Sequence, residues 1–402
     1  MGRIIVVVVD GMGDRPIDGK TPLQYANTPN IDLLCREGIT GQMNTITPGI
    51  VPGSDTGHLA IFGYDPYKTY PGRGVFEALG AGIKLEEGDV AFRCNLATVD
   101  EKLNVVDRRA GRIKDGKKIV EEIDGMEING VEIILKSTTE HRCSLVLRGE
   151  NLSNKISDVD PHSETKIWKS KALENTHEAR RTADIINKLV EESYKILKDH
   201  PINKEREKEG KLPANILLPR GAGKYVEIES IKEKWGFKAS CIAGGALYKG
   251  VARYLGASII DVRGATGRLD TNLHAKVDAA LKSAEQYEYT FLHIKGCDNA
   301  SHDGDFRAKA EMISRIDEEV VSKLIDFDGY VLITADHSTP VFVKRHTSDP
   351  VPILFHGEDV RRDSVELFDE ISVVHGGLGT LRGIDLMPIV SDYIGYYKMY
   401  GS

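Results

Sequence analysis

Four short apolar segments constrain the fold of this chain most. They are Ile4–Val9, Tyr289–Ile294, Tyr330–Thr334 and Val351–Phe355, each rich in β-branched or aromatic residues. Each segment ends abruptly in polar residues or glycine, as strands buried on both faces of a parallel sheet do. Residues 307–324, between the second and third segments, carry apolar side chains at helical spacing. This alternation predicts an α/β fold in which helices cover a mostly parallel sheet.

The middle of the chain predicts a second, smaller α+β domain. Residues 166–200 combine charged residues with apolar residues at helical spacing, whereas 131–135 and 144–147 resemble short strands. Asn-Gly and Asp-Gly pairs near these strands are turn signals. A chain of 402 residues is also long for a single core. We therefore expect a domain inserted into the first one, with segment boundaries at 1–70, 71–269 and 270–402.

The acidic composition excludes several classes of function. The formal net charge is −8, so the chain lacks the basic surplus typical of nucleic-acid binders. No apolar segment approaches the ~20 residues that span a bilayer, so we expect no membrane partner. The five cysteines are widely spaced and form no CxxC pair, which favours a reducing cytoplasm over a disulfide framework. Whether the chain forms a homo-oligomer stays open.

Acidic residues and histidines follow three of the four apolar segments. Asp10 comes after the first, Asp298 after the second, and the pair Asp336-His337 after the third. Ligands of open α/β sheets bind beyond the carboxyl ends of the strands, so we expect these loops to converge on one crevice. Any one of these aspartates could instead cap a helix or shape a turn. Three such coincidences favour a shared site.

Two further histidines extend this set. His302 lies four residues after Asp298, which places both on one face if a helix starts there. His346 lies in a polar loop, where a lone histidine is usually solvated. Together the candidates mix oxygen and nitrogen donors: Asp10, Asp298, His302, Asp336, His337 and His346. Such a mixture favours Mn²⁺, Zn²⁺, Co²⁺ or Fe²⁺ over Ca²⁺. Six ligands favour two ions about 4 Å apart, an arrangement typical of phosphate chemistry.

A nucleophile candidate precedes the expected insert. Ser54 follows a Pro-Gly turn and precedes a short helical pattern that ends at Gly63. It could be an inert helix N-cap, with Asp55 in the first turn. It could also attack phosphorus, since a serine at a helix N-terminus becomes nucleophilic beside a metal ion. The metal-ligand candidates elsewhere in the chain favour the nucleophile.

These motifs, taken in order, resemble a known enzyme family. They are VVVVDGMGDRP, PGSDTGH, HIKGCDNASHDGD and TADHSTP, followed by the later His346, together with DVRGATGRLDTN at residues 261–272. The set resembles the cofactor-independent phosphoglycerate mutases of the alkaline phosphatase superfamily, in their archaeal branch. The resemblance runs from residue 4 to about residue 385. It implies an alkaline-phosphatase-like α/β core with an inserted smaller α+β domain.

The resemblance also implies a division of ligands between two divalent ions, which would be Mn, Co, Zn or Mg. Asp298, His302 and His346 would hold one ion, while Asp10, Asp336 and His337 would hold the other, with Ser54 coordinated beside them. The implied reaction interconverts 3-phosphoglycerate and 2-phosphoglycerate through a phosphoserine on Ser54, with no 2,3-bisphosphoglycerate. The inserted domain would exclude water from the site and hold the glycerate.

Substrate residues are expected mainly among arginines, because the guanidinium group binds a carboxylate through paired hydrogen bonds. Arg263 and Arg268 come first, near the expected return from the insert, although they could be linker residues on the surface. The other candidates are Arg93, Asn95, Asp158, His162 and Lys295. Among these, Asp158 and His162 are expected to relay protons, and Lys295 to face the phosphate or the solvent.

Three other classes of function compete with this interpretation. A phosphomonoesterase or a phosphopentomutase would use the same metal core. A non-catalytic sensor derived from such an enzyme would not need to keep Ser54 together with all six ligands. A nucleotide-binding oxidoreductase is disfavoured, because the sequence after the first apolar segment lacks a GxGxxG loop.

Overall fold

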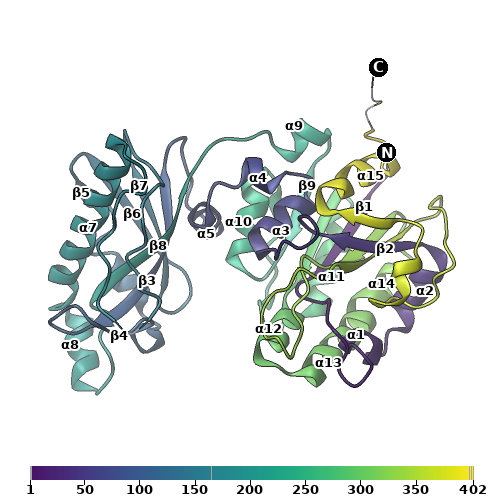
Figure 1. The fold of residues 1–402 in the computed structure, drawn as a ribbon, viewed down its shortest axis with the longest axis horizontal. Coiled ribbons are helices and arrows are strands. Elements are labelled where there is room, and N and C mark those ends of the chain that lie inside the picture. Colours follow the sequence, from purple (N-terminus) through teal and green to yellow (C-terminus); the bar gives the residue numbers. More distant parts are fainter. Residues whose placement is uncertain (1, 164, 398, 400, 402) are drawn as a thin grey trace. The chain divides into compact units, whose positions relative to one another are not determined.

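A large mixed sheet forms the centre of the part of the chain that contains both ends (Figure 1). The computed structural model describes residues 2–163, 165–397, 399 and 401. The strand order of this large sheet is β10-β9-β11-β1-β12-β13-β2-β14. The bounds are β1 Ile4–Val9, β2 Ile39–Asn44, β9 Ala239–Ile242, β10 Ser258–Ile259, β11 Tyr289–Ile294, β12 Tyr330–Thr334, β13 Val351–His356 and β14 Gly379–Arg382. The prediction of a mostly parallel α/β sheet is confirmed.

Three of the predicted strands lie side by side at the centre of this sheet. β1 pairs in parallel with β11 on one side and with β12 on the other. The register places Val9 opposite Ile294, and Val8 opposite Thr334. The carboxyl ends of the three strands are therefore level, so the segments that follow them begin at the same edge of the sheet.

The fourth predicted strand, β13, runs in the opposite direction. It is antiparallel to both β12 and β2, so its prediction as a parallel strand is wrong. Residues 335–350 connect β12 to β13 without a helix that would carry the chain back across the sheet. The chain therefore returns along the sheet without a crossover and forms an antiparallel pair.

The helices that belong with the large sheet pack in two groups. One group is centred on α3 and α10, and the other on α2, α11 and α13. The bounds are α1 Pro22–Tyr25, α2 Pro29–Glu37, α3 Ser54–Ile61, α4 Pro66–Thr69, α9 Ile231–Trp235, α10 Ala246–Tyr254, α11 Leu273–Ser283, α12 Gly296–Asp303, α13 Phe306–Ile316, α14 Ser322–Leu324 and α15 Leu386–Tyr393. The predicted helix at 307–324 corresponds to α13 and α14 with a π-helical segment, Asp317–Val321, between them. Within the described residues, no helix has the length and apolar character needed to cross a membrane.

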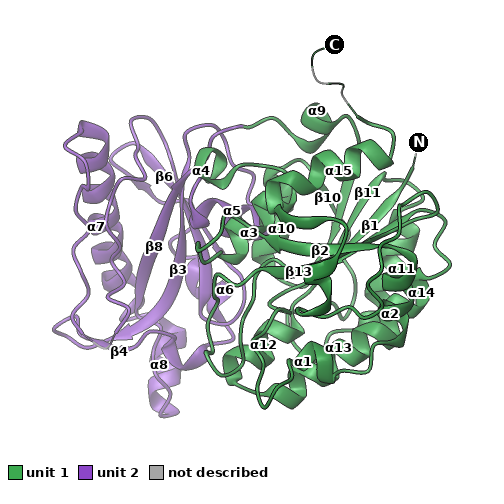
Figure 2. Ribbon diagram, turned by 45° about the vertical axis from the view of Figure 1, so that its right-hand side comes forward, with its two compact units in different colours: residues 1–70, 228–402 green, residues 71–227 purple. Residues whose placement is uncertain are grey.

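The chain divides into two compact units, shown in Figure 2. Unit 1 comprises residues 1–70 and 228–402, and unit 2 comprises residues 71–227. The insert therefore ends at 227 and not at 269 as expected. The reason is that residues 239–242 pair with β11 as strand β9, and β10 extends the same sheet from β9.

Unit 2 contains an antiparallel sheet with its own apolar core. Its strands follow the order β4-β3-β7-β6-β5, and β8 also pairs with β3. The predicted Asn-Gly turn is present, because Asn129 and Gly130 both have positive φ between β5 and β6. The bounds are β3 Val90–Val99, β4 Val105–Asp107, β5 Glu127–Ile128, β6 Val131–Ser137, β7 Arg142–Arg148 and β8 Ile216–Lys224, with helices α5 Arg73–Gly80, α6 Gly116–Val120, α7 His177–Leu197 and α8 Pro201–Lys208.

The long helix of unit 2 is shorter than the sequence indicated. Helical spacing suggested residues 166–200, whereas α7 begins at His177, after Thr176 accepts a hydrogen bond from the backbone N–H of Ala179. Residues before this cap form bridges to other segments, such as Ile156 with Ala172. Local pairing of this kind overrides the weak helical pattern of the sequence.

Candidate metal centre and nucleophile

The level strand ends bring the predicted acidic residues together in unit 1. Asp10 directly follows β1. Asp298 lies in the first turn of α12, after β11, and Asp336 follows β12. All three side chains are buried, although carboxylates are almost never buried without a partner. The convergence that the sequence predicted for these three loops is present in the structure.

Two groups of ligand atoms are close enough to hold ions. In the first, which we call the Asp10 cluster, one ligand atom each from Asp10, Asp336 and His337 lie within 4.8 Å of one another. The Nε2 atom of His337 lies 3.5 Å from Oδ1 of Asp10 and 3.3 Å from Oδ2 of Asp336. These two oxygens find no hydrogen-bond partner among the described residues, although both are buried. Buried oxygens without partners are rare, and a cation would satisfy both.

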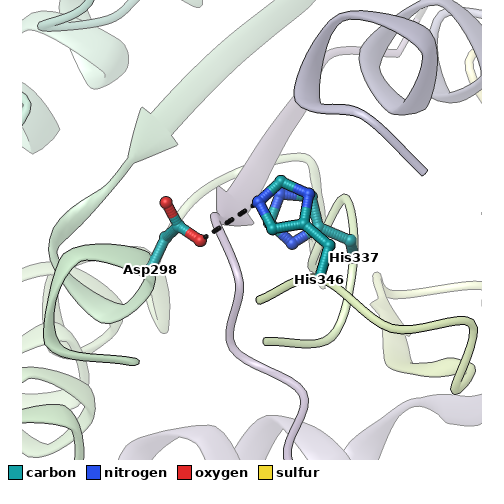
Figure 3. Close-up of side chains that lie close together, drawn as sticks. All are labelled: Asp298, His337 and His346. Carbon is teal, nitrogen blue, oxygen red and sulfur yellow. Dashed lines mark ion pairs between the residues drawn. The ribbon is translucent and has the colours of Figure 1, made fainter. Parts of the chain in front are cut away.

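The second group, the Asp298 cluster, contains Asp298, His337 and His346 (Figure 3). Oδ1 of Asp298 lies 3.5 Å from Nε2 of His346 and 3.3 Å from Nε2 of His302. The rings of His337 and His346 stack with centroids 3.5 Å apart. His337 thus belongs to both groups of atoms, and His302 lies beside the second one.

The three histidines share one hydrogen-bond arrangement. In each, Nδ1 contacts an oxygen at about hydrogen-bond distance: Thr339 Oγ1 at 3.0 Å for His337, the Lys344 carbonyl at 2.9 Å for His302 and the Pro52 carbonyl at 3.0 Å for His346. A carbonyl can only accept, so His302 and His346 donate from Nδ1–H, and when neutral they leave a lone pair on Nε2. Thr339 in turn donates to Asp298 at 3.1 Å, which makes it the acceptor for His337. Histidines that ligate metals are oriented in this way.

The charges of the Asp10 cluster also favour a cation. Burial raises the pKa of Asp336 well above its ordinary value, and the negative charge of Asp10 adds to this effect. Burial acts on the pKa of Asp10 in the same direction, but Lys295 and His293 hold it below its ordinary value. Burial lowers the pKa of His337 to about 3. The cluster therefore combines a neutral imidazole with a carboxyl group whose ionised form burial disfavours, and a divalent cation would offset that charge.

Ser54 lies at the first position of α3, where the chain enters the helix from a Pro-Gly turn. Gly53 occupies the N-cap, so the alternative that Ser54 is an N-cap serine is wrong. The side chain is buried, and its Oγ lies 3.4 Å from Nε2 of His337. The hydroxyl therefore faces the Asp10 cluster at the positive end of a helix, where negative charge is stabilised.

Three buried residues beside the cluster were not predicted: His58, Tyr248 and His293. The Nδ1 atom of His58 lies 2.5 Å from the Ser54 carbonyl, and the hydroxyl of Tyr248 lies 2.5 Å from Oδ2 of Asp10. His58 follows Ser54 by four residues on α3, a spacing that could have pointed to it. No sequence signal indicated Tyr248, because its segment was assigned to the insert.

The substrate residues predicted for unit 1 lie in two places. Lys295 contacts an aspartate of each cluster: its Nζ lies 2.7 Å from Asp298 and 3.3 Å from Asp10. Arg268 lines an open cavity of about 500 Å³ together with Asn299 and His302. Arg263 is exposed in the preceding part of the same loop. The amide of Asn299 holds this loop by donating to the Gly267 carbonyl at 2.7 Å.

Asp158 and His162, predicted in unit 2, lie in a group with two arginines. The Nε2 atom of His162 lies 3.3 Å from Asp158, and its Nδ1 lies 3.3 Å from Arg108 and 3.5 Å from Arg220. Arg108 also donates to the fully buried Asp160 through two nitrogens, at 2.9 and 2.6 Å. The sequence did not single out either arginine: Arg108 lies in a charged segment, and Arg220 lies in an apolar, glycine-containing strand with no motif around it.

Arg93 and Asn95, the remaining predicted residues, both have partners within unit 2. Nε of Arg93 lies 3.2 Å from Glu77, and burial lowers the pKa of Arg93 to about 10. The amide of Asn95 donates to the Arg108 carbonyl at 3.1 Å. Asn95 thus supports the segment that carries Arg108.

A mostly parallel sheet with helices packed on it, an inserted antiparallel unit and acid–histidine clusters at the strand ends define an alkaline-phosphatase-like α/β protein. Residues 35–203 match the family described as 2,3-bisphosphoglycerate-independent phosphoglycerate mutase. Relatives with that name in Methanococcus aeolicus and Methanocaldococcus jannaschii are each 47% identical to this chain. They cover 100% of it, over 100% and 99% of their own lengths.

Two solved structures are also similar to this chain over nearly its full length. A protein from Pyrococcus horikoshii has a TM-score of 0.87 and 38% identity, over 100% of this chain and 99% of its own. The cofactor-independent phosphoglycerate mutase of Thermoplasma acidophilum has a TM-score of 0.76 and 37% identity, over 98% of this chain and 100% of its own. The chain therefore belongs to the 2,3-bisphosphoglycerate-independent phosphoglycerate mutase family, a family of isomerases.

Proposed function

We propose that this chain interconverts 3-phosphoglycerate and 2-phosphoglycerate without 2,3-bisphosphoglycerate, and that Ser54 carries the phosphoryl group between the two half-reactions. The observation that carries this proposal is the position of Ser54. Its hydroxyl is buried at a helix N-terminus and faces the Asp10 cluster, 3.4 Å from His337. Family membership at 47% identity over the full chain supports the substrate.

We further propose that two divalent ions, of Mn, Co, Zn or Mg, bind at the clusters. Asp10, Asp336, His337 and Ser54 would hold one ion, and Asp298, His302 and His346 the other. The unpartnered oxygens of Asp10 and Asp336 and the orientation of the three histidines fit this donor set. Bound ions would offset the charge of the phosphoryl oxygens and lower the pKa of the serine hydroxyl.

In the first half-reaction, Ser54 Oγ forms a bond to phosphorus while the bond between phosphorus and the substrate oxygen breaks. The hydroxyl proton of Ser54 leaves, and the glycerate oxygen gains a proton, so phosphoserine and a glycerate that stays bound result. In the second half-reaction, the other hydroxyl of glycerate takes the phosphoryl group, and Ser54 regains its proton. A phosphatase differs only in that water performs this second transfer.

Arginines are our candidates for binding the anionic groups of the substrate. In unit 1, Arg268 lines the cavity next to His302 and offers a guanidinium to an anionic group. In unit 2, Arg108 and Arg220 offer two more, and buried Asp160 fixes their orientation. Asp158 and His162 stay our candidates for proton transfer, and Arg263, Arg93, Asn95 and Lys295 our candidates for supporting contacts. The cytoplasmic location and a homo-oligomer stay predictions.

Phosphorus NMR on metal-stripped protein tests the proposal. After addition of Mn²⁺, Co²⁺ or Zn²⁺, 3-phosphoglycerate should convert to 2-phosphoglycerate with little free phosphate. Ser54→Ala should lose this conversion by at least a factor of about 10³, since a missing nucleophile cannot form the phosphoserine. Free phosphate as the main product would instead indicate a phosphatase.

Ser240→Ala is a suitable control for this experiment. Ser240 is a buried serine of the same sheet, on β9, and its hydroxyl lies 2.7 Å from that of Ser283. Its loss removes a serine hydroxyl from the core of unit 1 without touching either cluster. We expect this variant to keep the conversion rate of the unaltered chain.

A further inference from the structure

The two oxygens of Asp10 have very different surroundings. Oδ2 lies 2.5 Å from the hydroxyl of Tyr248, 3.0 Å from Nε2 of His293 and 3.3 Å from Nζ of Lys295. Oδ1 finds no hydrogen-bond partner within the described part of the chain. The buried carboxylate therefore directs all of its protein hydrogen bonds through one oxygen.

Tyr248 and His293 are held rigidly against each other. Tyr248 comes from α10 and His293 from β11, and their rings stack with centroids 3.6 Å apart at an interplanar angle of 25°. Both are buried, with 4% and 1% exposure. Buried Lys276 donates to the backbone carbonyl of His293 at 2.6 Å, which fixes the strand at this point.

A purely structural role does not explain this asymmetry. Buried polar atoms are nearly always satisfied, so a carboxylate that only stabilises the core would have partners on both oxygens. Here three donors contact Oδ2, whereas Oδ1 faces the Asp10 cluster, 3.5 Å from Nε2 of His337. The arrangement resembles the hydrogen bonding behind metal ligands, where outer partners fix the orientation of a ligating carboxylate.

We propose that Tyr248 and His293 are positioning residues that clamp Oδ2 of Asp10 and so direct Oδ1 to a metal ion in the Asp10 cluster. This inference rests on the metal centre put forward in the proposed function. It goes beyond the ligand set, because neither residue is among the proposed ligands. It predicts that the two ion sites respond differently to loss of the clamp.

Titration of metal-stripped protein with Mn²⁺ alone tests this inference, with free Mn²⁺ followed by electron paramagnetic resonance. The unaltered chain should bind two ions. Tyr248→Phe should weaken one of them by about 10–100-fold, the usual effect of losing an outer partner of a ligand, and should leave the other unchanged. The selective loss distinguishes a positioning role from general destabilisation, which would weaken both.

His293 gives an independent test through a conservative pair of variants. His293→Gln keeps an N–H donor at a reach similar to Nε2, whereas His293→Leu removes it. We expect the glutamine variant to bind Mn²⁺ within about threefold of the unaltered chain and the leucine variant to lose about 10-fold or more at one site. Rescue by glutamine identifies the hydrogen bond, and not ring packing, as the cause.

Tyr289→Phe is the matched control. Tyr289 is also a fully buried tyrosine of this sheet, on β11, but its hydroxyl finds no hydrogen-bond partner within the described residues. The same atom is removed, so Mn²⁺ binding at both sites should stay unchanged.

The outcomes distinguish a failure of the clamp from a failure of the metal centre. If Tyr248→Phe and His293→Leu bind two ions with unchanged affinity, the clamp is wrong and the metal centre stands. If the unaltered chain binds none of Mn²⁺, Co²⁺, Zn²⁺ and Mg²⁺, both are wrong.

Discussion

At the scale of single residues, the centre depends on backbone space as much as on donors. Gly11 follows Asp10 with φ of +67°, and its N–H lies 3.2 Å from Oδ1 of Asp336. A Cβ atom here would lie 2.9 Å from both the Cβ of Asp298 and the Oγ1 of Thr339. Glycine is therefore required at position 11 for two reasons. It adopts the left-handed conformation without strain, and it leaves room for α12 to pack close to the backbone.

Gly11→Ala should therefore lower both stability and metal binding. We expect a loss of at least about 2 kcal/mol in the free energy of unfolding, from backbone strain plus displacement of Asp298. Thermal unfolding and Mn²⁺ titration measure the two effects.

Gly49→Ala separates strain from crowding in this test. Gly49 has φ of +82° but no atom within 4 Å of an added Cβ, so only the strain of about 1 kcal/mol should appear. Equal losses at the two positions would contradict the steric argument.

Much of the residue-scale site could be predicted, because its chemistry lies next to apolar segments. Asp10 is the first residue after β1, and Asp336 is the second residue after β12. Asp298 is the fourth residue after β11. Tyr248 could not be found in this way, since it reaches Asp10 from a different part of the chain. Its role depends on a contact across 238 residues that no local pattern encodes.

At the scale of elements, one buried network ties together the segments that carry the centre. Asp14, after β1, accepts from Nζ of Lys309 on α13 at 2.8 Å. The backbone N–H of Asp14 donates to Glu370 at 3.0 Å, and the hydroxyl of Thr21 donates to the same carboxyl group at 2.7 Å. Such a network makes the stability of this part of unit 1 depend on pH, because burial raises the pKa of Glu370 to about 7.

The sign of this dependence follows from where the proton is lost. The unfolded chain releases the Glu370 proton near its ordinary pKa of 4.5, and the folded chain releases it near 7. Stability from this group is therefore full below about pH 4.5 and falls as the pH rises to about 7. Glu370→Gln keeps a neutral group, so it should be more stable than the unaltered chain above pH 7, by at most about 3 kcal/mol.

Urea unfolding at several pH values between 5 and 8 measures this difference. It should shrink toward pH 5 and level off above pH 7. Glu366→Gln, which changes an exposed carboxylate in the same segment, should show no such trend. A constant advantage of Glu370→Gln at every pH would contradict burial as its cause.

Strand bounds were predictable because buried strands are continuous apolar runs with sharp ends. The direction of β13 was not, because it depends on the path of residues 335–350 and not on the strand itself. The start of α7 was missed for a related reason. Residues 166–176 have helical spacing, but pairing with other segments, as between Asn104 and Lys166, gives them another structure.

At the scale of the whole molecule, the insert is a compact unit whose two ends meet. The backbone N–H of Lys224 donates to the Pro71 carbonyl at 3.0 Å, three residues before the unit ends at 227. Its apolar core is formed by residues between Val90 and Leu218. A segment with its own core and adjacent ends has the features of an independently folding domain.

Residues 71–227 should therefore fold when expressed alone, whereas 71–269 should behave worse. The longer piece adds β9 and α10, whose buried residues pack in the sheet of unit 1 and would be exposed without it. We expect dispersed amide signals and one cooperative thermal transition for 71–227, and dye binding or aggregation for 71–269. A cooperative 71–269 with an unfolded 71–227 would instead support the boundary expected from the sequence, at which Arg263 and Arg268 belong to the insert. The comparison thus decides which unit supplies the arginines of that loop.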